Sequence, residues 1–411
     1  MKRTLKKFLP ENFVLSFHYI TAWVSALWYG FPSREMKVIG VTGTKGKTST
    51  ANFIWACLSA GGIKTGIITT ANIRIGDKER LNAYHMTMPG RFLIQKIMRE
   101  MVRAGCTYCV IETTSEGIKQ SRHIGIKYDI SVFTNLSPEH LESHGGSFEE
   151  YKKMKGKLFA AVKTIIANSD DAHSEFFLSF PALQNISFGI LNDVNVRAEN
   201  IQDTARGVDF SIKEKIFHLN ILGKFNVYNA LPAIIISRLA GVPDTAIAKG
   251  LSELHKIPGR MEIIDEGQKF LAIVDYAHEK VSMAAALGTA RAIAVNGAKV
   301  IVLLGAEGGG RDKAKRPQMG EIAAKMADYV VVSNVDPYDD EPIEILEDIA
   351  VSAERFGKIR GENLFAIEDR REGNRKALSL TREGDVVLIT GKGAEQSMII
   401  GGANIPWDDR V

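Results

Sequence analysis

The sequence predicts an α/β fold built as two domains, and three observations support this. The chain has 411 residues, of which 45% are hydrophobic and 24% charged, enough for more than one core. From Lys37 onward, short apolar runs alternate with stretches of helical length, the pattern of a mostly parallel sheet covered by helices. The pair Pro258 and Gly259 interrupts that pattern, and a second alternating series follows. We therefore expect a short N-terminal helical segment over 1–36 and α/β domains over 37–257 and 258–411.

One part of the first domain has a different periodicity. Between about Ile186 and Leu222 the apolar spacing shortens toward two, which indicates β-strands with one exposed face. We expect these strands to be antiparallel and to extend the edge of the first sheet. A helix is predicted to begin near Asn226.

Composition argues against several classes of protein. The formal net charge is only +4, and basic residues form no long stripe beyond Met1 to Lys7, so no nucleic acid partner is expected. Three cysteines are too few for a disulfide framework and suit a reducing compartment. Cys106 and Cys109 form a C-x-x-C pair in an apolar run, where core packing is favoured over redox or zinc chemistry. We predict a cytoplasmic protein that acts on small molecules.

The N-terminal segment from Phe13 to Phe31 contains no charged residue and follows several basic ones, as a signal anchor does. Polar residues interrupt it, and the next predicted strand begins only a few residues later. We expect a helix that packs on the body of the protein and makes no membrane contact. The alternative is a membrane-spanning or interfacial segment.

The segment from Val38 to Thr50, VIGVTGTKGKTST, places glycines, a lysine and hydroxyls between an apolar strand and a helix. Backbone N–H groups at such a turn can hold phosphates. Lys47 would neutralise the outer phosphates and the Thr48 hydroxyl would bind Mg²⁺. Val41 stands where the full P-loop motif has glycine, so this is a shorter variant. The residues expected at the nucleotide are Gly43, Thr44, Lys45, Gly46, Lys47, Thr48 and Ser49.

Polar groups also follow two other predicted strands. Glu112 ends one apolar run, and Glu139 and His140 follow another. Ligands bind at the carboxyl ends of strands in parallel α/β sheets, so these groups are expected beside the phosphate loop. Kinase, GTPase and ligase chemistry all remain open at this point.

The string FTNLSPEHLESHGGSFEEYKKMKGKLF, which begins at Phe133, closely resembles the signature of the Mur ligase family, and within it the UDP-N-acetylmuramyl-tripeptide synthetases. GKFNVYNALPA, PGRMEI, DYAH, GGGRDKAKRPQMG and GKGAE follow in the family's order and approximate spacing. The resemblance extends over essentially Lys37 to Val411. It implies a central P-loop ATPase domain and a C-terminal Rossmann-like domain. It also implies an ATP-dependent ligase that activates a carboxylate as an acyl phosphate and joins it to an amino acid in peptidoglycan synthesis.

The resemblance implies a catalytic set comprising Lys47, Glu112, His140 and Lys155. Lys47 and Thr48 would hold ATP and magnesium, and Glu112 and His140 a second magnesium. Lys155 stands where the family has a carbamylated lysine. A neutral amine that takes up CO₂ becomes an anionic carbamate able to bind metal.

The resemblance also implies the remaining contacts with substrates. Further contacts with ATP would come from Asn226, Asn229, Arg260 and Asp275, with His278 as an additional candidate. The acyl substrate would be held by Thr87, Ser115, Gln120 and Arg122. The incoming amino acid would be held by Arg311, Gly391 and Glu395.

Two departures from the family leave alternatives open. Only Met1 to Met36 precede the phosphate-loop strand, where tripeptide synthetases carry a UDP-binding domain. A partner could supply UDP recognition, the uridine could be held differently, or the acyl substrate could lack UDP, as in folylpolyglutamate synthases. Residues 335–338 read VDPY in place of the family's DNPR, so diaminopimelate specificity is not predicted. A non-catalytic nucleotide-binding partner protein is the third hypothesis.

Overall fold

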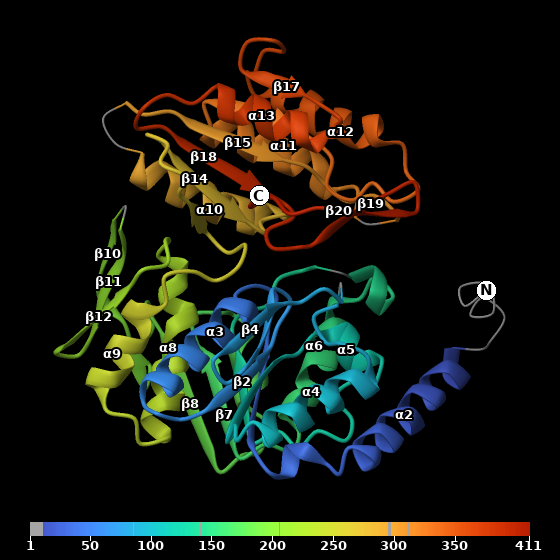
Figure 1. Ribbon diagram of the computed structural model, residues 1–411, viewed down its shortest axis with the longest axis vertical. Coiled ribbons are helices and arrows are strands. Elements are labelled where there is room, and N and C mark those ends of the chain that lie inside the picture. The colour runs from blue at the N-terminus through green and yellow to red at the C-terminus, as the bar shows by residue number, and fades with distance from the viewer. Residues whose placement is uncertain (1–10, 85, 140, 205, 295–296, 311) are drawn as a thin grey trace. The chain divides into compact units, whose positions relative to one another are not determined.

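The computed structural model describes residues 11–411 except 85, 140, 205, 295–296 and 311 (Figure 1). The chain forms two compact units. Unit 1 runs to Glu199 and adds Ser211–Phe217 and Tyr228–Glu253, whereas unit 2 comprises Asn200–Phe210, His218–Val227 and Leu254–Val411. The α/β class predicted from the sequence is confirmed in both units, and the domain boundaries proposed from the sequence remain predictions.

A nine-stranded sheet forms the centre of unit 1, in the order β4-β3-β2-β5-β1-β6-β7-β8-β9. The strands from β2 to β9 in this order pair in parallel, and β3 and β4 are antiparallel. The central strands are apolar and buried along their length, as expected where helices cover both faces of a parallel sheet. The bounds are β1 Lys37–Thr42, β2 Thr65–Ile68, β3 Asn72–Ile75, β4 Lys78–Leu81, β5 Tyr108–Glu112, β6 Ile130–Phe133, β7 Thr164–Asn168, β8 Gln184–Gly189 and β9 Val196–Arg197.

Two of the helices in this part of the chain begin with a side-chain cap. Thr114 and Ser147 cap α5 and α6 by accepting hydrogen bonds from Gly117 N and Glu150 N. The helical bounds are α2 Glu11–Trp28, η1 Pro32–Arg34, α3 Lys47–Ala60, α4 Arg91–Arg103, α5 Ser115–Lys119, η2 Leu141–His144, α6 Phe148–Gly156, η3 Lys157–Phe159, α7 Ser174–Leu178, α8 Phe225–Leu239 and α9 Asp244–Glu253.

The expectation that residues 186–222 extend the first sheet with antiparallel strands is wrong. Strands β10 (Glu199–Thr204), β11 (Gly207–Ile212) and β12 (Lys215–Leu219) form a separate three-stranded sheet. The strands of this range that extend the large sheet are β8 and β9, and both pair in parallel with their neighbours. A spacing of two indicates a strand with one exposed face but says nothing about which strand lies beside it.

Unit 2 contains a six-stranded sheet in the order β13-β14-β18-β15-β16-β17, which confirms the second predicted series of strands. All neighbours pair in parallel except β13 with β14. Alternate residues of β15 enter two different core clusters, so helices cover both faces. The bounds are β13 Glu262–Ile264, β14 Leu271–Asp275, α10 Lys280–Ile293, β15 Val300–Leu304, α11 Lys315–Met326, β16 Tyr329–Val332, α12 Pro342–Arg355, β17 Leu364–Ala366, α13 Arg370–Ser379, β18 Val386–Thr390, β19 Ser397–Ile400 and β20 Ala403–Pro406.

Helix α2 lies against α4 in unit 1 (Figure 1), which confirms the predicted N-terminal helix packed on the body. Among the described residues, no helix combines the length and apolarity needed to cross a bilayer. Cys106 and Cys109 are buried thiols in the core of unit 1, as predicted.

Candidate functional site

The predicted phosphate loop connects β1 to α3 at the carboxyl edge of the unit 1 sheet. Gly46 directly precedes α3 with a φ of +82°, a conformation that favours glycine. The Lys47 ammonium folds over the loop and donates to the carbonyls of Gly43 (3.1 Å) and Thr44 (2.7 Å). The loop therefore has the form expected for binding a phosphate at the positive end of a helix dipole.

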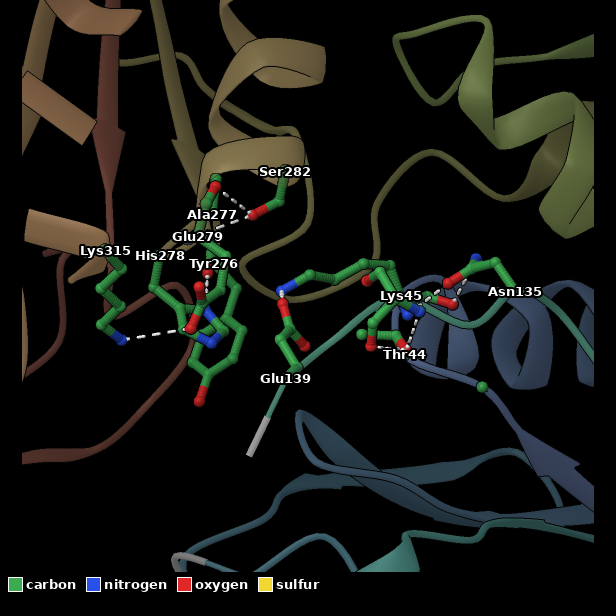
Figure 2. A network of polar contacts seen from close by, with 12 residues as sticks. Thr44, Lys45, Asn135, Glu139, Tyr276, Ala277, His278, Glu279, Ser282 and Lys315 are labelled. Atoms are coloured by element: carbon green, nitrogen blue, oxygen red, sulfur yellow. Dashed lines mark hydrogen bonds and ion pairs between the residues drawn. The ribbon is translucent and has the colours of Figure 1, made fainter. Parts of the chain in front are cut away.

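The segment after β6 holds this loop in place (Figure 2). Thr44 N donates to the Asn135 carbonyl at 2.8 Å, and Lys45 N donates to the Asn135 side-chain oxygen at 2.8 Å. Thr134 Oγ1 donates to the Lys45 carbonyl at 2.7 Å. Lys45 also forms an ion pair with Glu139, and Figure 2 shows the two side chains directed at one another. The backbone N–H groups of Thr44 and Lys45 are therefore already hydrogen-bonded within the protein. We expect a phosphate to contact the N–H groups at the start of α3 instead.

Thr48 and Glu112 come together as the sequence predicted. Thr48 Oγ1 donates to Glu112 Oε2 at 2.8 Å, and Thr70 donates to both carboxylate oxygens from its N–H (2.8 Å) and hydroxyl (3.0 Å). Hydroxyl and carboxylate oxygens are ligands that Mg²⁺ prefers. No group of three or more His, Cys, Asp or Glu side chains converges within the described ranges, and His140 lies outside them. The two oxygen ligands that are described fit a magnesium ion that keeps water and phosphate as its other ligands.

Lys155 is buried beside the phosphate loop. Its side chain is 2% exposed, its Nζ donates to the Gly43 carbonyl at 2.8 Å, and it lies over the Tyr151 ring at 4.5 Å. Burial, reinforced by the charge of Lys47, lowers the pKa of Lys155 well below 10.5. A neutral amine is the form that adds CO₂, so the environment fits the predicted carbamate. Lys153, by contrast, is an exposed residue that pairs with Glu150 at 3.1 Å.

The residues predicted for the acyl substrate lie on segments connected to this edge. Thr87 Oγ1 is 2.8 Å from Thr70 Oγ1, whose other contacts reach Glu112. Arg122 donates to the Met88 carbonyl, next to Thr87, and to Gln120 Oε1 at 2.8 Å. Within unit 1, contacts through Thr87 and Thr70 therefore connect Arg122 to Glu112, one of the two oxygen ligands suited to magnesium.

Ser115 is held by a residue that sequence reasoning did not select. The Ser115 hydroxyl is 3.0 Å from His144 Nε2, and both residues are buried. Burial lowers the pKa of His144, as does the charge of Lys119. A neutral His144 therefore orients Ser115.

Arg91 at the start of α4 was also missed. Its guanidinium donates to the Gln120 carbonyl at 2.5 Å, and burial together with the charge of Arg122 lowers the pKa of Arg91 to about 10. Within the described part of the chain, the buried Nε atoms of Arg91 and Arg122 have no hydrogen-bond partner. Two neighbouring guanidiniums of this kind suit a carboxylate ligand. No motif marks Arg91, which reaches Arg122 only through the packing of α4.

Asn229 and Asn226 on α8 have different environments. A Cβ placed on Gly46 would lie 2.1 Å from Asn229 Oδ1, so Asn229 reaches the phosphate loop. Asn226 instead donates to the Leu222 carbonyl at 2.7 Å. Ser49 is buried in the first turn of α3.

In unit 2, Asp275 ends β14 and organises the turn that follows. Its carboxylate accepts from Met261 N and Ala277 N, both at 2.8 Å. Burial raises the pKa of Asp275, and the charge of Arg260 opposes that shift. Arg260 stacks on the Tyr276 ring at 4.4 Å. His278 Nδ1 lies 2.7 Å from the Tyr276 carbonyl. The three predicted residues Arg260, Asp275 and His278 are thus brought together around one turn.

Glu395 belongs to a buried network that includes Lys392. Lys392 Nζ is 2.6 Å from Glu395 and 2.7 Å from Asp336, and the Tyr276 hydroxyl donates to Glu395 at 3.1 Å. Burial raises the pKa of Glu395. Gly391 begins the loop with a φ of +107°. Arg311 lies outside the described residues.

Figure 2 also shows the start of α10 in unit 2, where Lys315 Nζ lies 3.2 Å from Glu279. Glu279 and Ser282 form a capping box at this helix end. Glu307 is a second acidic neighbour of Lys315, at 3.9 Å.

Comparison with known families identifies the chain. Residues 41–237 match the Mur ligase middle domain, and residues 259–393 match the Mur ligase, glutamate ligase domain. The chain belongs to the Mur ligase family. This confirms the family inferred from the sequence and makes the chain an ATP-dependent ligase of the carboxylate–amine class.

Relatives cover nearly all of this Mur ligase. It is 36% identical over 407 residues to a UDP-N-acetylmuramyl-tripeptide synthetase of Roseiflexus sp. (strain RS-1), covering 94% of this chain and 79% of the relative. It is 37% identical over 425 residues to a UDP-N-acetylmuramoyl-L-alanyl-D-glutamate–2,6-diaminopimelate ligase of Geobacillus kaustophilus, covering 100% of this chain and 84% of the relative. Among solved structures, a folylpolyglutamate synthase of Mycobacterium tuberculosis has a TM-score of 0.73 at 18% identity over 90% of this chain and 92% of that one. That last likeness shows the fold alone.

Proposed function

We propose that this Mur ligase adds a diamino acid to a UDP-N-acetylmuramoyl peptide through an acyl-phosphate intermediate. The observation that supports this best is the arrangement at one edge of unit 1. The phosphate loop, the Thr48–Glu112 pair and the buried Lys155 lie there, and contacts through Thr70 and Thr87 extend to Arg122. Such an edge can hold a nucleotide beside a carboxylate.

In the first step, a carboxylate oxygen of the acyl substrate attacks the γ-phosphorus of ATP while the bond to the β,γ-bridging oxygen breaks and ADP leaves. Lys47 would stabilise the charge that develops on the transferred group. Magnesium held by Thr48 and Glu112 would neutralise phosphate charge. Arg91 and Arg122 would orient the acyl substrate through a carboxylate.

In the second step, the amine of the amino acid attacks the acyl carbon, phosphate leaves with the bonding electrons, and the amine loses a proton. Gly391, Glu395 and Arg311 are the residues proposed for this amino acid. Glu395 is already paired with Lys392 and Tyr276 in unit 2, which would fix its orientation toward an ammonium group.

We include a carbamate on Lys155 in this proposal. Its neutral amine adds CO₂ to give N–COO⁻ and releases one proton, which replaces a buried amine by an anion suited to the magnesium site. The low pKa of Lys155 supports this because only the unprotonated amine reacts.

The proposal also concerns which diamino acid is added. Several relatives are named diaminopimelate ligases. In this chain, however, Tyr338 occupies the position of the family's arginine, and its backbone pairs with Ile399 and Gly401 of the β19–β20 hairpin. We therefore expect lysine or another diamino acid without a distal carboxylate to compete well with diaminopimelate.

The test is ATP-dependent phosphate release with UDP-N-acetylmuramoyl-L-alanyl-D-glutamate and a panel of amino acids, with each product identified by its mass. We expect an amide with a diamino acid, and a loss of about 1,000-fold or more in kcat for Lys47→Ala. Turnover with a folate or glutamyl-peptide acceptor, and none with the UDP substrate, would contradict the proposed acyl substrate. Equal phosphate release by Lys47→Ala would contradict the proposed nucleotide site.

A further inference from the structure

Helix α2 presents its large apolar side chains to solvent. Phe13, Phe17, Ile20, Val24 and Leu27 follow one another at spacings of four and three residues, which places them on one face. That face is exposed, with exposed fractions of 61% for Phe13, 69% for Leu27 and 77% for Trp28, which adjoins it. Single exposed apolar residues are ordinary on protein surfaces, but a continuous stripe over about four helical turns marks an interaction surface.

The orientation of α2 is fixed by the body of unit 1. Its inner face carries the small residues Ala22, Ser25 and Ala26, which are buried. A Cβ added to Gly125 would lie 2.6 Å from Ala26 Cβ, so the packing here is close. Arg99 on α4 donates to the carbonyls of Tyr29 (2.8 Å) and Gly30 (3.0 Å) just after the helix. The large side chains therefore cannot turn inward without breaking these contacts.

Basic residues lie at the end of this helix. A cavity of about 310 Å³ follows η1, and four of its lining residues are the exposed cations Arg34, Lys37, Lys127 and Lys163, against two acidic residues. In the sequence, Lys2, Arg3, Lys6 and Lys7 precede α2, and residues 12–33 contain no Asp, Glu, Lys or Arg. Beyond Glu11 at its first position, α2 is thus uncharged and lies between two groups of positive charge along the chain.

We propose that α2 binds the surface of an anionic lipid bilayer. The apolar face would enter the boundary between headgroups and acyl chains, and the cations around the cavity would contact lipid phosphates. Trp23, Trp28 and Tyr19 suit this depth because their rings are apolar and their N–H or O–H groups can reach water. Charge distinguishes lipid from a second copy of this chain, since pairing two α2 helices would bring positive groups together at their ends.

Co-sedimentation of the full chain with vesicles tests this. We expect binding to vesicles that contain phosphatidylglycerol, weaker binding to phosphatidylcholine vesicles, and a loss on adding salt. The triple variant Phe17→Ser, Ile20→Ser, Leu27→Ser should bind at least about tenfold more weakly. The matched control Leu183→Ser, Ile216→Ser replaces residues that are 87% and 76% exposed elsewhere, and it should bind like the wild type.

A second variant, Lys127→Glu, Lys163→Glu, tests the cations around the cavity. It should abolish the preference for anionic vesicles while leaving ligase turnover unchanged. Circular dichroism and thermal unfolding establish that each variant is folded, and Leu27→Ser alone replaces the triple variant if that one unfolds. Binding that is equal in the wild type and the α2 variant would overturn the proposal. So would the absence of vesicle binding together with a wild-type dimer that the triple variant loses, since the face would then join two copies.

Discussion

Two regions of unit 1 break the usual arrangement of polar and apolar groups in opposite directions. At the phosphate loop, the Lys155 amine and the charged Glu112 carboxylate are buried, whereas along α2 the large side chains of Phe13, Ile20 and Leu27 are exposed. Burying a charge and exposing an apolar stripe both cost free energy. The two regions differ in how that cost is offset.

At the phosphate loop, internal hydrogen bonds offset much of the cost. Glu112 accepts three hydrogen bonds from Thr48 and Thr70, and Lys155 donates to Gly43. This site is organised before any ligand binds, which favours catalysis. Along α2, the described residues offer no cover for the exposed face, so the offset must come from binding. The first region is thus built for chemistry and the second for attachment.

Replacement of Lys155 should have the largest effect on turnover. Lys155→Ala should lower kcat by about 100-fold or more, because it removes the group proposed to become an anion at the metal site. Lys153→Ala, two residues away on the same helix and exposed, should leave turnover unchanged.

A second readout separates a carbamate from a structural role for Lys155. Wild-type protein in ¹³C-bicarbonate should show a carbamate signal by NMR that Lys155→Ala lacks, and removal of CO₂ should lower wild-type turnover. A wild-type spectrum without that signal would contradict the carbamate, and full activity in Lys155→Ala would exclude Lys155 from the mechanism.

The next largest effect is expected from Arg91 and Arg122, the two arginines proposed to bind the acyl substrate. Arg122→Lys keeps the charge but loses the planar fork, so we expect KM for the acyl substrate to rise about 10-fold to 100-fold with little change in kcat. Arg91→Lys should act in the same direction. Arg103→Lys, at the exposed far end of α4, is the control and should leave KM unchanged. A fall in kcat at constant KM would place Arg122 in the chemical step instead.

Sequence reasoning found the loop and strand-end residues because each lies in a contiguous motif whose chemistry its residue types reveal. Lys47, Thr48 and Glu112 meet at one edge simply because parallel strands end there. Arg91 and His144 were missed because their contacts with Gln120 and Ser115 depend on tertiary packing. Lys392 was missed because its contact with the distant Asp336 does so as well.

The same limit applies to larger elements. The apolar composition of α2 predicted a helix, but not that Ala22 and Ala26 would face the body while the large residues face out. Periodicity locates a stripe on a helix and leaves open which stripe packs inward. The separate β10–β12 sheet was misplaced for an equivalent reason, because alternation does not identify a strand's neighbour.

The smallest effect is expected from replacing two glycines that lie at opposite ends of α3. Gly46 and Gly62 have nearly equal φ values of +82° and +78°, so replacement by alanine imposes the same backbone strain of about 1 kcal/mol at each. A Cβ at Gly46 would lie 2.1 Å from Asn229 Oδ1, whereas one at Gly62 would meet nothing within 4 Å. Denaturant unfolding should therefore show Gly46→Ala to be less stable than Gly62→Ala by a further ~1 kcal/mol or more. Because the displaced group is Asn229, KM for ATP should also rise in Gly46→Ala alone. Equal stability and equal KM in the two variants would mean that the phosphate loop adjusts to a new side chain as easily as the surface turn does. The loop would then not be the rigid region, held by internal hydrogen bonds, that distinguishes it from α2.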